Sequence, residues 1–408
     1  MKILIYGINF SPELTATGKY SGEMAEWMAR EKQDVRAVTA PPYYPEWKVK
    51  SPYSSWKYKK EVISNVTVFR CPLYVPKKVS TLKRLIHLTS FTLSSFPQLF
   101  RNFFWKPDLV ICVAPTLFCV PFAKLFSKVT KAKLIIHIQD YEVDAMFGLN
   151  LANMGGLSKL ARRFEKWCLS KADFVSTISN TMIDKAISKG VKRENTIFFP
   201  NWSELDKFKN ILVNDVEEFR KGLNLPSNRK IILYSGNVGD KQGLEIIPDI
   251  ASNPAFSDSV FLIVGEGAGK KRLEEKVLSS QLTNVLFRPL QPYNKLPLLL
   301  SMADCHLVIQ KRGAADAVLP SKLTNILAVG GNAIITAEIH TELGQLTTNY
   351  PGIAVRVEPE SDVSLTEGLI HALSLPKFNS IAESYANKML DKEVILNEYL
   401  EVISSKVN

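Results

Sequence analysis

Several segments place glycine beside a charged residue just after an apolar run, the arrangement in which phosphate-binding loops begin. After the apolar residues 230–234 comes Gly236-Asn237-Val238-Gly239-Asp240-Lys241. Two glycines, a cation and a helix start can form a cradle for a pyrophosphate, with Lys241 as its point charge. The alternative is a bare turn, and a lysine between glycines at a strand end favours the phosphate site.

Two predicted helix starts could also bind phosphate. Gly18 follows the loop after the first apolar run, and Ser321-Lys322 precede the helical pattern 323–329. Free backbone amides and the positive end of the helix dipole suit an anion there. Gly18 would let a substrate approach the backbone, and Ser321 and Lys322 could hold phosphate or ribose hydroxyls. The alternatives are an ordinary turn at Gly18 and a structural N-cap at Ser321.

The segment Gly265-Glu266-Gly267-Ala268-Gly269-Lys270 resembles a P-loop, but its spacing differs from one. Walker A requires four residues between its glycines, a glycine directly before the lysine and Ser or Thr after it. The Rossmann spacing is also absent. We therefore predict a tight strand-to-helix turn in which Gly265 and Glu266 line a ligand-binding cleft, and we expect no ATPase activity.

The densest group of ionisable side chains follows the apolar run 133–138. It contains His137 and Asp140, with Glu142 and Asp144 close behind. A carboxylate at a strand end can orient sugar hydroxyls and a neighbouring histidine can move protons, so Asp140 and His137 are the predicted catalytic residues. A histidine at a strand end can equally be a structural hydrogen-bonding residue.

Residues 81–104 combine leucine and aromatic residues with flanking cations. Polar residues interrupt the segment too often for a bilayer span, but a basic amphipathic helix can lie among lipid headgroups. Lys83, Arg84 and Phe91 are the predicted membrane-contacting residues of this segment. The alternative is a helix packed on a sheet.

These segments fit a chain in which short apolar runs alternate with helical patterns. The first series of predicted strands comprises Lys2–Tyr6, Asp34–Thr39, Val66–Arg70, Asp108–Val113, Lys133–Ile138, Asp173–Thr177 and Thr196–Phe199. The second series comprises Lys230–Tyr234, Val260–Val264, Asn284–Phe287, Asp304–Ile309 and Asn332–Thr336. Alternation of this kind predicts an α/β fold with parallel sheets covered by helices on both faces.

We predict two doubly wound, Rossmann-like domains that face a cleft. The first covers residues 1–205, the second covers 206–375, and helices at 376–408 cross back to the first domain. The polar stretch 203–229 is predicted to be the linker. Ligands of such sheets bind beyond the carboxyl ends of the strands.

Composition narrows the function further. The net charge of +11 indicates an anionic partner, while the five scattered cysteines argue against a disulfide framework or a zinc site. No signal peptide or transmembrane segment is recognisable, so we expect a cytoplasmic protein. Nucleic-acid recognition motifs are absent, so we expect no nucleic-acid partner.

Taken together, these segments resemble GT-B-fold glycosyltransferases of family 4 along nearly the whole chain. The motifs that carry the resemblance are Tyr6–Glu13, Thr39–Pro45, His137–Glu142, Phe199–Trp202, Ser235–Gly239 and Pro320–Leu323. The resemblance implies a retaining, metal-independent transfer without a cofactor, in which the second domain binds a nucleotide-sugar and the first binds the acceptor. Tyr43 and Tyr44 would belong to the acceptor and membrane side.

Within the family, the chain is most similar to fucosyltransferases of colanic acid synthesis. That similarity implies GDP-fucose as donor and glucose on undecaprenyl pyrophosphate as acceptor, with the enzyme peripheral on the anionic inner face of the cytoplasmic membrane. No residue pattern by itself identifies the sugar.

The chain departs from the family at several positions. Asn237 stands at the position of a pyrophosphate-binding arginine, and the paired glutamates are replaced by Ala317 and Asn325. Phosphate neutralisation would then pass to Lys241 and Lys322. Two alternatives remain open at this point: a nucleotide-sugar epimerase, and a catalytically inactive membrane scaffold.

Overall fold

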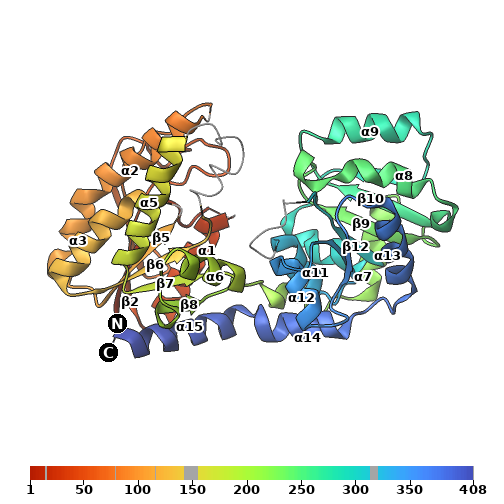
Figure 1. The fold of residues 1–408 in the computed structure, drawn as a ribbon. Helices are drawn as coiled ribbons and strands as arrows, with labels where there is room; N and C mark the ends of the chain where they lie inside the picture. Colours follow the sequence, from red (N-terminus) through yellow and green to blue (C-terminus); the bar gives the residue numbers. More distant parts are fainter. Residues whose placement is uncertain (14–15, 79, 115, 142–154, 313–319, 408) are drawn as a thin grey trace. The chain divides into compact units, whose positions relative to one another are not determined.

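The computed structural model describes residues 1–408 except 14–15, 79, 115, 142–154, 313–319 and 408. The chain divides into two compact units (Figure 1). Unit 1 comprises Met1–Asn201 together with Leu396–Asn408, and unit 2 comprises Trp202–Ile395. The predicted α/β class of fold, with two Rossmann-like domains, is confirmed.

Unit 1 is built on an eight-stranded sheet in the order β3-β4-β2-β1-β5-β6-β7-β8. Its strands are β1 (Lys2–Tyr6), β2 (Asp34–Thr39), β3 (Lys59–Ile63), β4 (Val66–Arg70), β5 (Leu109–Ala114), β6 (Lys133–Ile138), β7 (Phe174–Thr177) and β8 (Thr196–Phe198). All neighbours are parallel except β3 and β4. The central strands β1, β5 and β6 are buried, except for the first residue of β1 and of β6, as parallel strands covered on both faces must be.

Unit 2 repeats this architecture with a six-stranded parallel sheet in the order β11-β10-β9-β12-β13-β14. Its strands are β9 (Lys230–Ser235), β10 (Ser259–Val264), β11 (Val285–Arg288), β12 (Cys305–Val308), β13 (Ala333–Thr336) and β14 (Val355–Val357). The strand order reverses between β9 and β12, and this switch point is where ligands of open α/β sheets bind.

Helices cover both sheets. Those of unit 1 are α1 (Ala16–Arg30), α2 (Thr81–Arg101), α3 (Val120–Thr130), α5 (Gly155–Lys171) and α6 (Asn180–Ser188). Those of unit 2 are α7 (Val213–Gly222), α8 (Ile247–Ala251), α9 (Lys270–Ser279), α10 (Leu296–Ser301), α11 (Ser321–Ala328), α12 (Glu342–Asn349), α13 (Asp362–Ser374) and α14 (Ser380–Met389). Within the described residues, no helix is both long and apolar enough to cross a bilayer.

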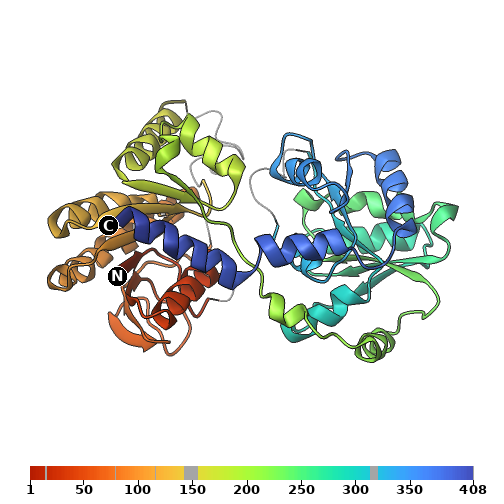
Figure 2. The same ribbon diagram turned by 90° about the horizontal axis from the view of Figure 1, so that it is seen from below.

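The last helix, α15 (Lys392–Val407), begins in unit 2 and continues in unit 1 from Leu396 onward. In unit 1 the ring of Tyr399 stacks on Phe199 with 3.6 Å between the ring centroids, and Lys406 Nζ donates to the carbonyl of Glu194. Both chain termini therefore lie in unit 1 (Figure 2).

The structure corrects two details of the prediction. The stretch 203–229 is more than a linker, since it contains α7, on which Val216 is buried in the core of unit 2. Strand β3 was not predicted because its sequence Lys-Lys-Glu-Val-Ile is largely polar. The signal that could have found it is the hairpin turn Ser64-Asn65, where both residues have positive φ.

Candidate functional site

At the carboxyl edge of the unit 2 sheet, the two glycine-containing loops pack directly on each other. Val238 N donates to the carbonyl of Glu266 at 2.8 Å, and Gly269 N donates to the carbonyl of Val238 at 2.9 Å. A Cβ on Gly265 would overlap the carbonyl oxygen of Gly236. Glycine is therefore required at position 265 by loop packing. Glu266 is exposed and pairs with Lys270 at 2.7 Å.

The loop after β9 leaves two of the predicted donor-binding side chains open to solvent. Asn237 is exposed, and Tyr234 Oη donates to its carbonyl at 2.6 Å. Lys241 lies in the 3-10 turn Asp240–Gln242, where its ammonium makes no ion pair with any described residue. The positive φ of Gly236, 148°, allows the chain to turn at the end of the strand.

A cavity of about 160 Å³ lies between β9, β12, α10 and α11, and we call it the Lys322 cavity. Its polar lining is Ser235, His306, Lys322 and Asn325, and its apolar lining is Leu233, Leu296, Leu300, Leu307 and Ile326. Burial lowers the pKa of Lys322 to about 8. Its ammonium lies 4.4 Å from the centre of the Tyr234 ring, and no described carboxylate lies within ion-pair distance.

Two more of the predicted donor-binding residues, Ser321 and Asn325, lie on α11. Of these two, only Asn325 has a described side chain. Asn325 Oδ1 accepts a hydrogen bond from Ser203 Oγ at 2.8 Å. Ser321 begins α11, but its side chain lies outside the described structure, as does the whole of Ala317. The predicted donor contacts of Asn325 and Ser321 stay predictions.

His306 was not among the predicted site residues and lies in the same cavity. It is buried on β12, burial lowers its pKa to about 3, and neither ring nitrogen has a partner in the described structure. A Cβ on Gly331 would lie 2.7 Å from its Nε2, so the ring sits against the backbone of that residue. A histidine inside an apolar strand followed by Gly330-Gly331 was the only available signal.

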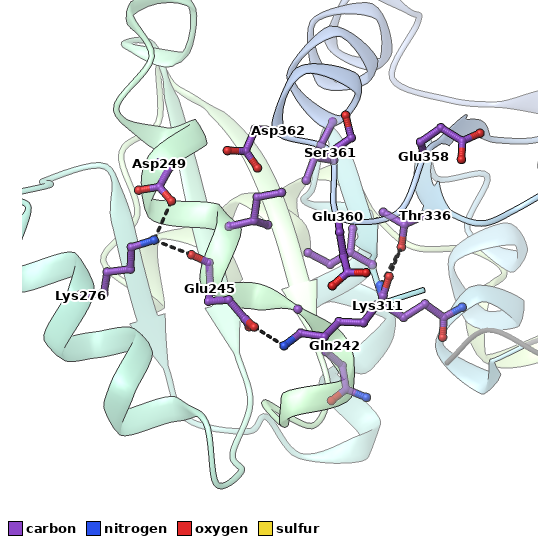
Figure 3. Close-up of a pocket in the computed structure, with 15 residues that line it drawn as sticks. Gln242, Glu245, Asp249, Lys276, Lys311, Thr336, Glu358, Glu360, Ser361 and Asp362 are labelled. Carbon is purple, nitrogen blue, oxygen red and sulfur yellow. Dashed lines mark hydrogen bonds and ion pairs between the residues drawn. The ribbon is translucent and has the colours of Figure 1, made fainter. Parts of the chain in front are cut away.

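A larger cavity of about 290 Å³ opens elsewhere on unit 2, and its side chains carry mostly negative charge (Figure 3). Its acidic lining residues are Glu245, Asp249, Glu358, Glu360 and Asp362. Both of its lysines are engaged: Lys311 pairs with Glu245, and Lys276 with Asp249 at 2.6 Å. Excess carboxylate repels phosphate, so the Lys322 cavity is the better candidate for an anion.

In unit 1, His137 is held inside a hydrogen-bond network. Its Nδ1 lies 2.9 Å from Ser176 Oγ, and Gln139 Nε2 donates to its Nε2 at 2.8 Å. Gln139 and Asn201 exchange two hydrogen bonds of 3.1 Å. Burial lowers the pKa of His137 to about 3, so the ring stays neutral. This corrects the predicted proton shuttle, because both nitrogens are occupied and the ring positions Gln139.

Asp140 follows β6 at the carboxyl edge of the sheet and is exposed, as a group that contacts a substrate must be before binding. Glu142 and Asp144 lie outside the described residues. Of the predicted acidic cluster, Asp140 is the carboxylate that the structure places at this edge.

The loops around Gly18 are organised by a buried carboxylate that the sequence analysis did not single out. Glu13 Oε1 accepts hydrogen bonds from the backbone amides of Tyr43 (3.0 Å) and Tyr44 (3.1 Å), and Asn9 donates to Oε2 at 2.9 Å. A Cβ on Gly18 would come within 2.6 Å of Glu13 Cβ. The close approach at Gly18 is therefore made by Glu13, whereas a substrate was predicted.

Helix α2 presents some of the predicted membrane residues to solvent and buries another. Lys83 is exposed and Arg84 is half-buried, but Phe91 is fully buried against Tyr6. The membrane role predicted for Phe91 is wrong, since it faces the sheet. Tyr43 is likewise buried, whereas Tyr44 is 38% exposed.

Comparison with known proteins identifies the family of this chain. Residues 15–202 match the family model described as glycosyl transferase 4-like domain, and residues 215–389 match glycosyl transferases group 1. The chain is 57% identical over 406 residues to an Escherichia coli K12 protein provisionally named colanic acid biosynthesis glycosyl transferase WcaI. That similarity covers 99% of this chain and 100% of the relative.

Solved structures share the fold at low sequence identity. Sucrose-phosphate synthase from Thermosynechococcus elongatus superposes with a TM-score of 0.74 at 17% identity, covering 99% of this chain and 98% of the other. Anabaena HepE, solved in complex with UDP-glucose, superposes with a TM-score of 0.67 at 15% identity, covering 99% and 100%. These similarities establish the architecture of the chain.

Proposed function

This chain belongs to the group 1 glycosyltransferases with a glycosyl transferase 4-like N-terminal domain, and we propose that it transfers L-fucose from GDP-fucose to glucose on undecaprenyl pyrophosphate. The name of the Escherichia coli relative supports a place in colanic acid synthesis. A nucleotide-sugar donor is compatible with this fold, since Anabaena HepE, which shares it, was solved with UDP-glucose.

The proposed donor site rests on Lys322, whose ammonium is largely buried. A buried ammonium is costly unless an anion compensates it, and no described carboxylate does so. Its position at the start of α11 adds backbone amides and the positive end of a helix dipole. A nucleotide diphosphate would supply the missing negative charge, and we assign the exposed Lys241 to the same group.

We assign the roles in the reaction from these positions. Lys322 and Lys241 stabilise the diphosphate as it leaves, which is the place where charge develops in the transition state. Asp140 orients the acceptor hydroxyl. His137 holds the side chain of Gln139, the residue directly before Asp140, through a hydrogen bond. The transfer proceeds with retention and without a metal or cofactor in this proposal.

We expect the melting temperature to rise with GDP and GDP-fucose and to stay unchanged with UDP- and dTDP-sugars. A ligand at about 100 times its Kd stabilises the native state by about 2.7 kcal/mol, which thermal unfolding resolves readily. Lys241→Ala should reduce the shift, whereas Lys271→Ala, on the exposed surface of α9, should preserve it.

A rise in melting temperature with UDP-sugars alone would refute GDP-fucose as the donor but would remain consistent with a glycosyltransferase. Absence of any shift would favour the inactive scaffold. Of the two alternatives to a transferase, the epimerase is disfavoured by family membership.

We also propose that the enzyme works on the anionic cytoplasmic face of the membrane. Helix α3 of unit 1 packs against both α2 and α5 (Figure 1). These three helices carry exposed large apolar side chains together with lysines and arginines. We call this surface the interfacial face, and its apolar members are Leu82, Ile86, Leu93, Leu125, Val129, Leu160 and Trp167. Apolar side chains among cations suit an anionic headgroup region.

We expect the combined substitution Leu82→Ser, Ile86→Ser and Leu93→Ser to abolish flotation with vesicles that contain phosphatidylglycerol. These side chains are 68%, 47% and 61% exposed, so their replacement removes membrane contacts with little cost to folding. The matched control is Leu278→Ser, Val363→Ser and Ile370→Ser on unit 2, which should float like the wild type. Equal flotation of both triple variants would contradict the proposal.

A further inference from the structure

The Lys322 cavity contains a buried histidine to which the proposed reaction gives no role. His306 lies on β12 in register with Leu233 of β9, and its side chain is 1% exposed. Both ring nitrogens are buried, and neither has a hydrogen-bond partner among the described residues. A buried polar atom is costly when it is unsatisfied, and most such atoms in proteins bind a protein group or an ordered water. We therefore expect a partner inside the cavity that His306 lines.

The cavity has the size and polarity of a site that holds water. Its volume of about 160 Å³ is enough for a few water molecules, each of which occupies about 30 Å³ in the liquid. Lys322 can donate hydrogen bonds into it, and the hydroxyl of Ser235 can donate and accept. Asn325 uses its Oδ1 to accept from Ser203, so its contribution to the cavity is a donor, Nδ2. Water in this cavity can therefore make several hydrogen bonds to its lining.

Lys322 is the residue of this lining that most needs an acceptor. Its neighbours in the cavity are mainly leucine and isoleucine side chains, and its ammonium lies 4.4 Å from the centre of the Tyr234 ring. An aromatic ring attracts a cation but accepts no conventional hydrogen bond. The N–H groups of the ammonium consequently need oxygen or nitrogen acceptors within the cavity.

No other charge in the described residues compensates the ammonium of Lys322. Helix α11 packs against β12, β13, α14 and the 3-10 turn Leu205–Phe208. Apart from His306, the titratable residues of these elements are Asp206, Lys207, Cys305, Glu383, Tyr385 and Lys388, and β9 adds Lys230 and Tyr234. None of these residues is among the causes that lower the pKa of Lys322, which burial alone accounts for.

His306 is suited to be the acceptor because its ring stays neutral. Burial, and to a smaller extent the positive charge of Lys377, lower the pKa of His306 to about 3. Lys377 itself is held by a hydrogen bond of 3.2 Å to the carbonyl of Met302. A neutral imidazole has one nitrogen that accepts a hydrogen bond in either tautomer. A protonated ring would have no acceptor and would repel the ammonium of Lys322.

We infer that His306 is a positioning residue of the donor site, which accepts a hydrogen bond from the Lys322 ammonium through water in the cavity and so keeps that ammonium charged until a diphosphate binds. This inference rests on the proposed function, because that function assigns the donor diphosphate to Lys322. His306 does not contact the donor and acts only through Lys322.

The direct test is the titration of Lys322 in the full-length protein without any ligand, followed by NMR of protein that is isotope-labelled at the lysine ε-carbon. The signal of Lys322 is the one missing from Lys322→Met. We expect its midpoint to fall by about one pH unit in His306→Leu, the size expected when one hydrogen bond to a charged group is lost. His306→Gln, whose amide oxygen can accept, should restore most of the wild-type midpoint.

The matched control is His87→Leu. His87 is also 1% exposed and its Nε2 has no partner among the described residues, but it lies on α2 of unit 1. Its replacement removes a buried imidazole of the same kind, and the midpoint of Lys322 should not move. A fall of equal size in His87→Leu and His306→Leu would contradict the inference.

The same change should appear in the affinity for GDP. At pH 8 the affinity of His306→Leu should be about fivefold below that of the wild type, because about half of Lys322 is protonated in the wild type and about a tenth in the variant. At about pH 6 the two affinities should be equal, since Lys322 is charged in both. In a Lys322→Arg background, His306→Leu should have no effect at either pH, because arginine stays charged. A merely structural role of His306 would weaken binding at both pH values and in both backgrounds.

Three results decide between the possible failures. A Lys322 midpoint that is equal in the wild type and in His306→Leu overturns the inference. If His306→Leu does not fold, a crystal structure of the wild type that resolves ordered water decides: water that links His306 to Lys322 by hydrogen bonds supports the inference, and a cavity without such water overturns it. Failure of the proposed function has a different signature, namely no thermal shift with GDP-fucose and no fucose transfer, while the midpoint of Lys322 still depends on His306.

Discussion

Replacing Lys322 with methionine is expected to lower kcat/KM for the donor by about 10²–10³-fold, the loss typical when one group that stabilises transition-state charge is removed. Methionine fills a similar volume without the charge, so the core beneath α11 should be preserved. The expected effect is large because the ammonium is mostly buried in an apolar setting, where water screens its attraction for a diphosphate only weakly.

The same residue predicts a pH dependence with a definite sign. Burial lowers the pKa of Lys322 to about 8 in the free enzyme, and a bound diphosphate favours the charged form and raises it again. Donor affinity should therefore fall as the pH rises above about 8, because binding then requires uptake of a proton. The free energy of unfolding should rise with pH over the same range above about 8. The reason is that Lys322 in the unfolded chain keeps its proton to higher pH than Lys322 in the folded protein does.

The control variants for this prediction are Lys322→Arg and Lys270→Met. Arginine stays charged throughout, so Lys322→Arg should bind donor without the decline above pH 8. Lys270 pairs with the exposed Glu266, so Lys270→Met should leave donor affinity nearly unchanged. Donor affinity that is unaffected by Lys322→Met, or a decline that persists in Lys322→Arg, would assign the phosphate contact to another group.

Replacing Arg70 with methionine is expected to lower the free energy of unfolding by about 3–5 kcal/mol, the range for removing one partner of a buried ion pair. Arg70 Nε donates to Glu61 at 2.8 Å, and its other nitrogens bind the carbonyls of Ala40 and Ser11. The guanidinium also lies 5.3 Å from the centre of the Tyr53 ring. Its loss leaves three acceptors without their donor and removes the hydrogen bonds that fix the loops after β1 and β2.

Urea denaturation of the variant, compared with Arg30→Met, checks this prediction. Arg30 also has a carboxylate neighbour, Glu31 at 3.3 Å, but both side chains are exposed, so the expected cost is below about 1 kcal/mol. The loss of unfolding free energy in Arg70→Lys should lie between those of Arg70→Met and Arg30→Met, because lysine keeps the charge but cannot reach three acceptors at once. Equal stabilities of Arg70→Met and Arg30→Met would show that the buried contacts contribute no net stability.

The sequence by itself determined the order and type of the main elements of this protein. Strands such as Lys2–Tyr6 and Lys133–Ile138 are predicted with their observed bounds, because a parallel strand covered on both faces must be a short apolar run. Helix starts and glycine turns at their ends then place Lys241, Lys322 and Asp140 at the carboxyl edges of the two sheets. The site region could be predicted because that edge follows from strand direction alone.

Only the tertiary structure decided what each side chain at those edges does. Phe91 and Leu93 are both apolar residues of one helix, yet Phe91 faces the sheet and Leu93 faces solvent. The surroundings of His137 and His306 include Ser176 and Gly331, which lie on other segments. Periodicity and motif spacing report local geometry, whereas burial, pKa and hydrogen-bond partners arise from residues distant in the chain.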